Sequence, residues 1–111
     1  MPPRRTHPEG RPRGMLVGCL RLRVAIRGAA SLKEKRMVIK SVKDRLAHRF
    51  NASVAEVGDL DLLQVGVLGV AMAGNDEAYL EGALSKMVDF VRFSQAELLD
   101  YRIEVFPWDG A

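Results

Sequence analysis

The hydrophobic pattern of this chain changes its period at Gly28. Residues 15–27 alternate between two sets of side chains, which is typical of a strand with one face in the core. Gly28 is expected to supply the positive φ of the turn that follows. Ser31-Leu-Lys-Glu34 then has the spacing of a capping box, in which the Ser31 hydroxyl accepts from the Glu34 N–H and the Glu34 carboxylate reaches back to the Ser31 N–H. The first unit of the fold is therefore predicted to be a strand, a glycine turn and a capped helix.

The predicted helix extends from Ser31 to about Phe50 and has an apolar and a basic face. Its apolar residues recur every three to four positions, as in a helix that packs one face against a core. They are Leu32, Val38, Ile39, Val42, Leu46 and Phe50. The opposite face carries a basic row at i, i+3, i+7 and i+10 spacing, with two arginines at its flank. These residues are Lys33, Arg36, Lys40 and Lys43, flanked by Arg45 and Arg49.

The remaining elements are two strands, a second helix and a last strand. A strand is predicted over residues 53–58, and residues 63–73 are apolar on both faces, which indicates a central strand covered at least in part on both sides. Asn75 is a good cap for a second helix that runs to about Phe93. The inward residues of that helix are Leu80, Leu84, Met87, Val88 and Val91. Residues 96–106 alternate as a final strand, one face of which is formed by Leu99, Tyr101, Ile103 and Val105.

This order of elements limits the fold strongly. With right-handed crossovers and one hairpin, it gives a four-stranded antiparallel sheet with both helices on one face, the ferredoxin-like βαββαβ arrangement of the α+β class. The domain is expected to cover residues 15–106, and residues 107–111 form a short C-terminal end. Residues 1–14 are basic, Pro-rich and poor in apolar side chains, so they are predicted to be a disordered tail. Met15 is then an alternative translation start.

Charge is unevenly distributed along the chain. Residues 1–14 carry four arginines and one glutamate, which accounts for the whole formal net charge of +3. Residues 15–49 contain ten basic and two acidic residues, whereas residues 50–111 contain three basic and eleven acidic ones. The predicted domain is therefore neutral overall, with a basic first half and an acidic second half.

The composition argues against several classes of protein. The longest nearly apolar run, residues 65–73, is too short to span a bilayer, so no membrane association is expected. The single cysteine, Cys19, cannot form an intramolecular disulfide and fits a reducing cytoplasm. No Cys/His ligand spacing, phosphate loop or dinucleotide fingerprint occurs, and Asp59 with Asp61 is ordinary turn chemistry. We therefore expect no metal, no cofactor and no catalytic residue, which favours a non-enzymatic role.

The start of the first helix is the strongest candidate binding site. Free N–H groups at a helix N-terminus bind anions, and cations surround Ser31 in the sequence. The basic row on the same helix extends this surface and would follow a phosphate backbone. The structural alternative is that the capping box satisfies the free donors and that the cations form a solvated face. The candidate nucleic-acid- or anion-binding residues are Arg27, Ser31, Lys33, Lys35, Arg36, Lys40 and Lys43.

The face of the sheet away from the helices is a second candidate surface. Arg21 and Arg23 on the first strand are expected to pair with Asp100 and Glu104 on the last, which argues against stacking of RNA bases there. The apolar strand over residues 63–73 predicts instead that another subunit covers the sheet, as in a homodimer.

Several segments resemble the YlxP-like family of bacterial proteins. They are Met15-Leu-Val-Gly-Cys-Leu, Ser31-Leu-Lys-Glu-Lys-Arg36, Arg49-Phe50-Asn51, Ser53-Val-Ala-Glu-Val-Gly58, Asp61-Leu62, Gln64 and Asn75-Asp76. The resemblance covers residues 15 to about 106 and departs at Asp59 and Leu63, where the family has a histidine and an aromatic residue. It implies a ferredoxin-like domain of unknown function. Members are often encoded beside translation initiation and ribosome-binding factor genes, an association that favours work with RNA or the ribosome.

Three functions are consistent with these observations. The first is a non-enzymatic module that binds ribosomal RNA or a ribosomal subunit through the basic helix. The second is a self-associating regulatory or scaffold module. The third is a small-molecule sensor or enzyme that binds an anion at Ser31.

Overall fold

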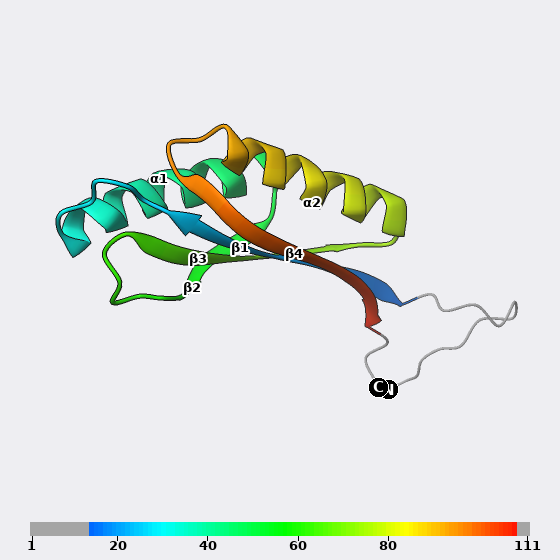
Figure 1. The fold of residues 1–111 in the computed structure, drawn as a ribbon. Helices are drawn as coiled ribbons and strands as arrows, with labels where there is room; N and C mark the ends of the chain where they lie inside the picture. The colour runs from blue at the N-terminus through cyan, green and yellow to red at the C-terminus, as the bar shows by residue number, and fades with distance from the viewer. Residues whose placement is uncertain (1–13, 109–111) are drawn as a thin grey trace, which may run out of the picture.

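Two helices lie on one face of a four-stranded antiparallel sheet (Figure 1). The structure is a computed structural model and describes residues 14–108. In chain order its elements are β1 (Met15–Ala25), α1 (Leu32–Phe50), β2 (Ser53–Gly58), β3 (Val65–Gly74), α2 (Glu77–Arg92) and β4 (Glu97–Trp108). The strand order is β2-β3-β1-β4, which confirms the predicted ferredoxin-like α+β fold. The predicted tail over residues 1–14 lies almost entirely outside the described residues.

β1 and β3 are the two interior strands of the sheet. β1 pairs with β3 on one side, from Leu16 opposite Gly74 to Ala25 opposite Val65. On its other side it pairs with β4, starting from Met15 opposite Trp108. The chain leaves β1 through Gly28, whose φ of +85° confirms the predicted positive-φ turn.

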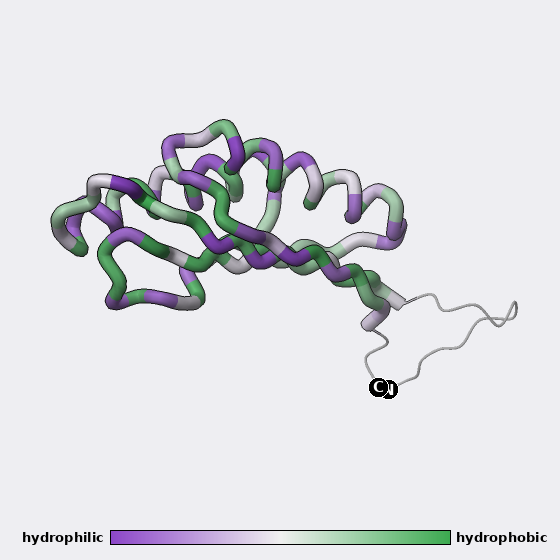
Figure 2. Tube along the Cα trace, in the orientation of Figure 1, coloured by the Kyte–Doolittle hydropathy of each residue, from purple (hydrophilic) through white to green (hydrophobic). Residues whose placement is uncertain are grey.

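The core fills the space between the two helices and the face of the sheet that they cover. Figure 2 shows hydrophobic and hydrophilic residues alternating along the strands and recurring with each turn of the helices. All five residues predicted to point inward from α2 are buried, and α1 contributes Ile39, Val42 and Leu46. The sheet contributes Leu20, Leu22, Val24, Leu68 and Val70. The period of the apolar residues thus identifies the buried face of α2 correctly, and that of α1 in part, because Leu32, Val38 and Phe50 are only half-buried.

A β-bulge overturns one part of the predicted pattern in β4. Asp100 lies opposite Arg23 and Leu98 lies opposite Val24, so that Leu99 is left as the extra residue. The bulge turns Leu98 toward the core and leaves Leu99 exposed, although the alternation predicted Leu99 on the inward face. Tyr101 stays opposite Leu22 but is also exposed at this edge of the sheet. A bulge residue is recognised only when the strand is paired with its neighbour. The alternation of apolar and polar residues along β4 therefore could not reveal it.

The remaining differences are small shifts at the ends of elements. β3 begins at Val65 rather than at residue 63, and β4 continues to Trp108 beyond the predicted end. The N-cap of α2 is Asp76 instead of Asn75, and its carboxylate accepts from the Ala78 N–H at 3.1 Å. No helix among residues 14–108 has the length and apolarity needed to cross a membrane.

Glycine in β3 lets α1 approach the sheet closely. A Cβ atom placed on Gly66 would lie 2.9 Å from Cδ1 of Ile39 and 3.5 Å from Cε of Lys35. Both of these side chains are buried, so neither can move aside without disturbing its own neighbours. A side chain at this position would therefore separate the helix from the strand.

We predict opposite effects of the same substitution at two glycines. Gly66→Ala should lower the free energy of unfolding by about 1–3 kcal/mol, because it overpacks the contact with Ile39. Gly82→Ala should raise it by about 0.5–1 kcal/mol, because Gly82 is exposed within α2 and nothing lies within 4 Å of its added Cβ. Urea unfolding followed by circular dichroism measures both changes. Equal effects of the two substitutions would contradict the close approach of α1.

Candidate functional site

The helix start at Ser31 forms the predicted capping box with one difference in its partners. The Ser31 Oγ accepts from the Glu34 N–H at 3.1 Å. The Glu34 carboxylate accepts from the Ala30 N–H at 2.8 Å, one residue before the predicted Ser31 N–H. Two donors near the start of α1 are therefore satisfied within the chain. An anion site at Ser31 stays a prediction, and the contacts of this turn are those of a cap.

Lys35 is the residue whose position differs most from the sequence prediction. Its side chain is 1% exposed, so it does not lie on the surface where an anion site was expected. Its Nζ donates to the carbonyl oxygen of Asp59 at 2.5 Å and lies 3.4 Å from Oε2 of Glu56. The reason is helical geometry, because Lys35 precedes the buried residues Ile39 and Val42 by four and seven positions. This spacing was visible in the sequence and is the signal that could have placed Lys35 on the buried face.

The contacts of Lys35 connect α1 to the edge of the sheet. Glu56 lies on β2, and its Oε2 is buried without a hydrogen bond. Asp59, in the turn after β2, has a φ of +56° and presents its carbonyl oxygen to Lys35. The Asp59 carboxylate in turn lies 3.6 Å from Nε of Arg23 on β1. A buried ammonium with these partners holds the helix and the β2–β3 turn together.

Arg27 is also engaged within the fold. Its guanidinium donates through Nε and Nη2 to the two carboxylate oxygens of Glu97 at the start of β4. The hydrogen bond from Arg27, followed by its positive charge, lowers the pKa of Glu97. The pair is solvent-exposed, so an incoming anion would compete with Glu97 for Arg27.

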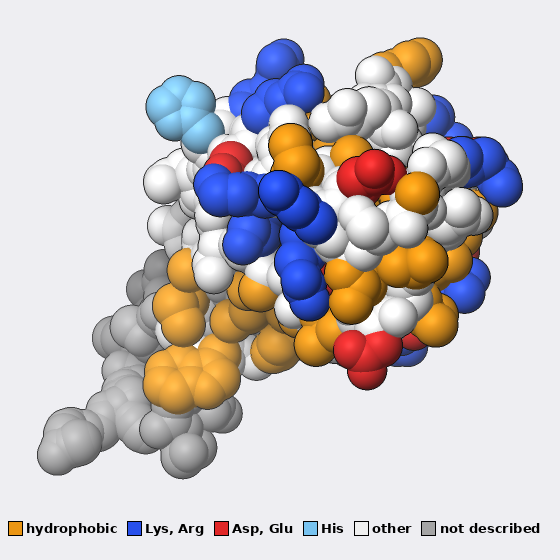
Figure 3. All heavy atoms as spheres, turned by 90° about the vertical axis from the view of Figure 1, so that its left-hand side faces the viewer, with side chains coloured by type: hydrophobic (Ala, Val, Ile, Leu, Met, Phe, Trp, Pro, Cys, Tyr) orange, Lys and Arg blue, Asp and Glu red, His pale blue; other side chains and the backbone are white. Residues whose placement is uncertain are grey.

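The outward face of α1 keeps three cations without an acidic partner. Lys40 donates to Asp44 at 2.6 Å, and this hydrogen bond is the main cause of the lowered pKa of Asp44. Within residues 14–108, no carboxylate oxygen lies within 4 Å of the charged groups of Lys33, Arg36 or Lys43. Figure 3 shows Lys and Arg side chains gathered at the end of the molecule where α1 begins. We call Lys33, Arg36 and Lys43 the free basic row.

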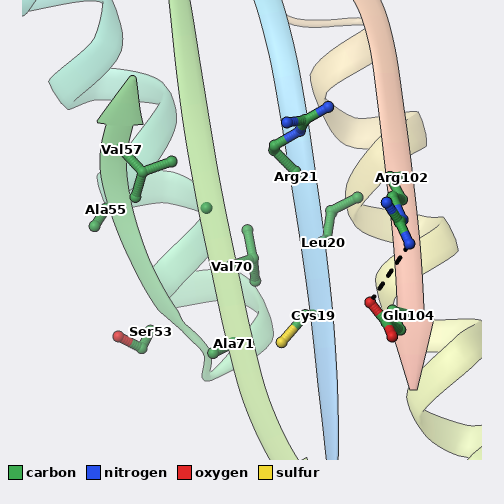
Figure 4. Close-up of a pocket in the computed structure, with 11 residues that line it drawn as sticks. Cys19, Leu20, Arg21, Ser53, Ala55, Val57, Val70, Ala71, Arg102 and Glu104 are labelled. Atoms are coloured by element: carbon green, nitrogen blue, oxygen red, sulfur yellow. Dashed lines mark ion pairs between the residues drawn. The ribbon is translucent and has the colours of Figure 1, made fainter. Parts of the chain in front are cut away.

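The open face of the sheet is hollowed by small side chains (Figure 4). The hollow has a volume of about 540 Å³, and all four strands contribute to it. Its floor is formed by small residues, among them Cys19, Ala55, Gly69 and Ala71. No group of three or more His, Cys, Asp or Glu side chains that could hold a metal ion occurs in the described part of the chain.

The ion pairs on this face differ from those predicted. Arg21 lies opposite Arg102 in the register of β1 and β4, and Arg23 makes its ion pair with Asp59 instead. Arg102 lies 3.9 Å from Glu104 on its own strand, as the dashed line in Figure 4 indicates. The predicted ion pairs of Arg21 and Arg23 with Asp100 and Glu104 do not form among residues 14–108, although Arg23 does lie opposite Asp100. The strands are neighbours as expected, but the register places like charges opposite one another at Arg21.

Comparison with known proteins identifies the family of this chain. A family model described as a protein of unknown function (DUF503) matches residues 17–103. The chain belongs to the DUF503 family. It is 32% identical over 92 residues to the uncharacterized protein YlxP of Bacillus subtilis (strain 168), which covers 82% of this chain and 100% of that protein. The resemblance to YlxP-like proteins is thus confirmed.

Two solved structures resemble this DUF503 domain. The de novo designed protein Foldit4 matches with a TM-score of 0.51 and 13% identity, covering 85% of this chain and 98% of that one. The de novo designed protein Ferredog-Diesel matches with a TM-score of 0.45 and 14% identity, covering 79% and 83%. At this identity, the similarity to Foldit4 concerns the fold alone.

We predict that Lys35 stabilises the domain while Lys33 does not. Lys35→Met should lower the free energy of unfolding by on the order of 3 kcal/mol, because it leaves Glu56 without its buried cation. Lys33→Met is the matched control on the exposed face and should change it by less than about 0.5 kcal/mol. The double variant Lys35→Met/Glu56→Gln should recover part of the loss. Denaturant unfolding that gives equal values for the two single variants would contradict this role.

Proposed function

We propose that this protein is a non-enzymatic RNA-binding module, with ribosomal RNA or a ribosomal subunit as its ligand, and that α1 makes the contact. The observation that carries the proposal is the free basic row of Lys33, Arg36 and Lys43. These charges have no acidic partner within residues 14–108, although residues 15–111 contain as many acidic as basic residues. A face of this kind fits the phosphate backbone of a nucleic acid.

The arrangement of the row on the helix supports this choice of ligand. Its first and last members are ten residues apart, which corresponds to about 15 Å along the helix axis. Cations on such a span reach several phosphates along one strand, and each contact releases condensed counterions. The helix lies on the surface of the molecule, so a strand of RNA meets no obstacle from the sheet (Figure 1).

The open face of the sheet is less suited to RNA. Domains of this topology that bind RNA there stack bases on aromatic side chains in the middle of the sheet. Here the middle of the sheet has a floor of small residues, and the aromatic residues of β4 on this face, Phe106 and Trp108, lie toward its far end. The helical layer is therefore the better surface for RNA.

Removal of the free basic row should weaken RNA binding and reduce its dependence on salt. The triple variant Lys33→Ala/Arg36→Ala/Lys43→Ala should lower the slope of log affinity against log salt by about 2, because each lost phosphate contact with single-stranded RNA contributes about 0.7. Filter binding or anisotropy with ribosomal RNA fragments and purified ribosomal subunits, over a range of KCl concentrations, gives this slope.

The matched control removes three cations from other surfaces. Arg21→Ala/Arg92→Ala/Arg102→Ala changes the net charge by the same amount but leaves α1 intact. This control variant should retain most of the slope of log affinity against log salt. Equal losses in the two triple variants would show that net charge alone controls the affinity, and would remove α1 as the interface.

A second candidate function is self-association through the open face of the sheet. Val57 is 57% exposed, and Phe106 and Trp108 are 36% and 55% exposed on the same face. Exposed large apolar side chains on the same face as a hollow of small residues fit a second copy of the sheet better than they fit water.

Self-association would be disrupted by a charge in the middle of that face. Ala71 lies in the floor of the hollow and is exposed, so Ala71→Arg should leave the fold intact and convert a dimer into a monomer. Glu81→Arg, on the exposed surface of α2, serves as the control and should not alter the association. Sedimentation equilibrium measures both variants, and a wild-type monomer at high concentration and low salt would contradict the dimer.

A further inference from the structure

A hollow of about 650 Å³ opens between the C-terminal halves of α1 and α2. It lies on the flank of α1 that faces α2 and shares no residue with the free basic row. Its walls carry basic and aromatic side chains together. They include Arg45, Arg49 and Phe50 from α1, Lys86 and Phe90 from α2, and Phe93 at the end of α2.

The hollow has an excess of positive charge. Within residues 14–108, no carboxylate oxygen lies within 4 Å of the charged groups of Arg45, Arg49 or Lys86. The one acidic residue in its wall is Asp89, which already lies 3.9 Å from Nε of Arg92. Three cations around one concave surface attract an anion, and guanidinium groups bind phosphate oxygens in a two-pronged geometry.

Arg49 is held in position by two aromatic rings. The rings of Phe50 and Phe90 meet edge to face, with centroids 6.3 Å apart and an interplanar angle of 80°. The guanidinium carbon of Arg49 lies 5.9 Å from the Phe50 centroid and 5.7 Å from the Phe90 centroid. These cation–π contacts favour this placement of the Arg49 guanidinium without using its hydrogen-bond donors. Its donors are therefore available to a ligand.

Phe93 is an exposed ring on a fixed backbone. Its side chain is 86% exposed, the largest exposure among the big apolar residues of the described chain. It is the C-cap of α2, and its N–H donates to the Asp89 carbonyl at 3.2 Å. The following residue, Ser94, donates through N and Oγ to the Val91 carbonyl at 3.0 and 2.7 Å. These bonds fix the backbone at Phe93, and its exposed ring lines the hollow.

We propose that this hollow binds a phosphorylated nucleoside, with the base stacked on Phe93 and the phosphate held by Arg45, Arg49 and Lys86. A phosphate alone would need no exposed ring, and an apolar ligand alone would need no cations. A planar ring linked to a phosphate uses both features, and stacking on an aromatic side chain is tolerant of base identity. The volume lies within the range of about 300–1,000 Å³ that is usual for small-ligand sites.

The ligand has two sources, a free mononucleotide or one nucleotide of a single-stranded RNA. The site goes beyond the proposed function, because none of its residues belongs to the free basic row and a free nucleotide would fill it. In its RNA form the inference rests on the proposed function and adds a contact for one base. The experiment below separates the two sources.

Titration of the full chain with AMP, adenosine and ribose 5-phosphate tests the site, with two-dimensional NMR as the measurement. AMP should bind at least about fivefold more tightly than either of the other two, since it alone uses the ring and the cations together. Phe93→Ala should lower the AMP affinity toward that of ribose 5-phosphate. Arg45→Gln/Lys86→Gln should lower it toward that of adenosine. Tyr79→Ala removes another exposed ring at the first turn of α2 and should change nothing.

A single-stranded pentanucleotide then identifies the source. Binding of the pentanucleotide at least about tenfold tighter than AMP, lost in Phe93→Ala, assigns the site to an RNA strand, and AMP binding as tight as that of the pentanucleotide assigns it to a free nucleotide. The variant lacking the free basic row should bind AMP as the wild type does, so failure of the proposed RNA interface is distinguishable from failure of this site. AMP binding that does not exceed that of ribose 5-phosphate, or that is unchanged in Phe93→Ala, would overturn the proposal.

Discussion

The position of every other element depends on the pairing of β1 with a strand on each side. Its ladder with β3 and β4 fixes which side chains of the central strand face the helices. Leu20, Leu22 and Val24 therefore enter the core, while Cys19 and Arg21 face the open side. A shift of one residue in this register would exchange the two faces. It would bury a guanidinium and expose the leucines, so the register is strongly determined by burial.

The helical layer distributes its cations among three physical roles. Lys35 is a structural residue, because its ammonium is buried between the Glu56 carboxylate and a backbone carbonyl of the β2–β3 turn. Arg27 and Lys40 are neutralised by exposed carboxylates close to them. Lys33, Arg36 and Lys43 have no carboxylate oxygen within 4 Å of their charged groups among residues 14–108. The ratio of ten basic to two acidic residues in residues 15–49 therefore overstates the basic surface available to a ligand.

The two faces of the sheet differ in the kind of partner they fit. The helical layer presents cations on the outward side of α1 and, with aromatic rings, in the hollow between the helices. The open face presents a hollow lined by small residues and by Arg21, Arg102 and Glu104, with exposed apolar side chains that include Val57, Phe106 and Trp108. Since the surfaces lie on opposite sides of the sheet, the proposed phosphate-bearing ligand and the proposed second copy of the chain would not compete.

The sequence by itself determined the order of elements, the ferredoxin-like fold, the capping box at Ser31, the turn at Gly28 and the buried residues of α2. These features depend on contacts between residues a few positions apart, or on a period repeated along one element. Only the tertiary structure decided that Leu99 is a bulge residue, that Arg21 faces Arg102 and that Lys35 meets Glu56. It also brought Arg45 and Arg49 to Lys86 and Phe93 across some forty residues of chain. Such pairs depend on strand register and helix packing. Both are determined by the packing of the whole core, so no short segment of the sequence predicts them.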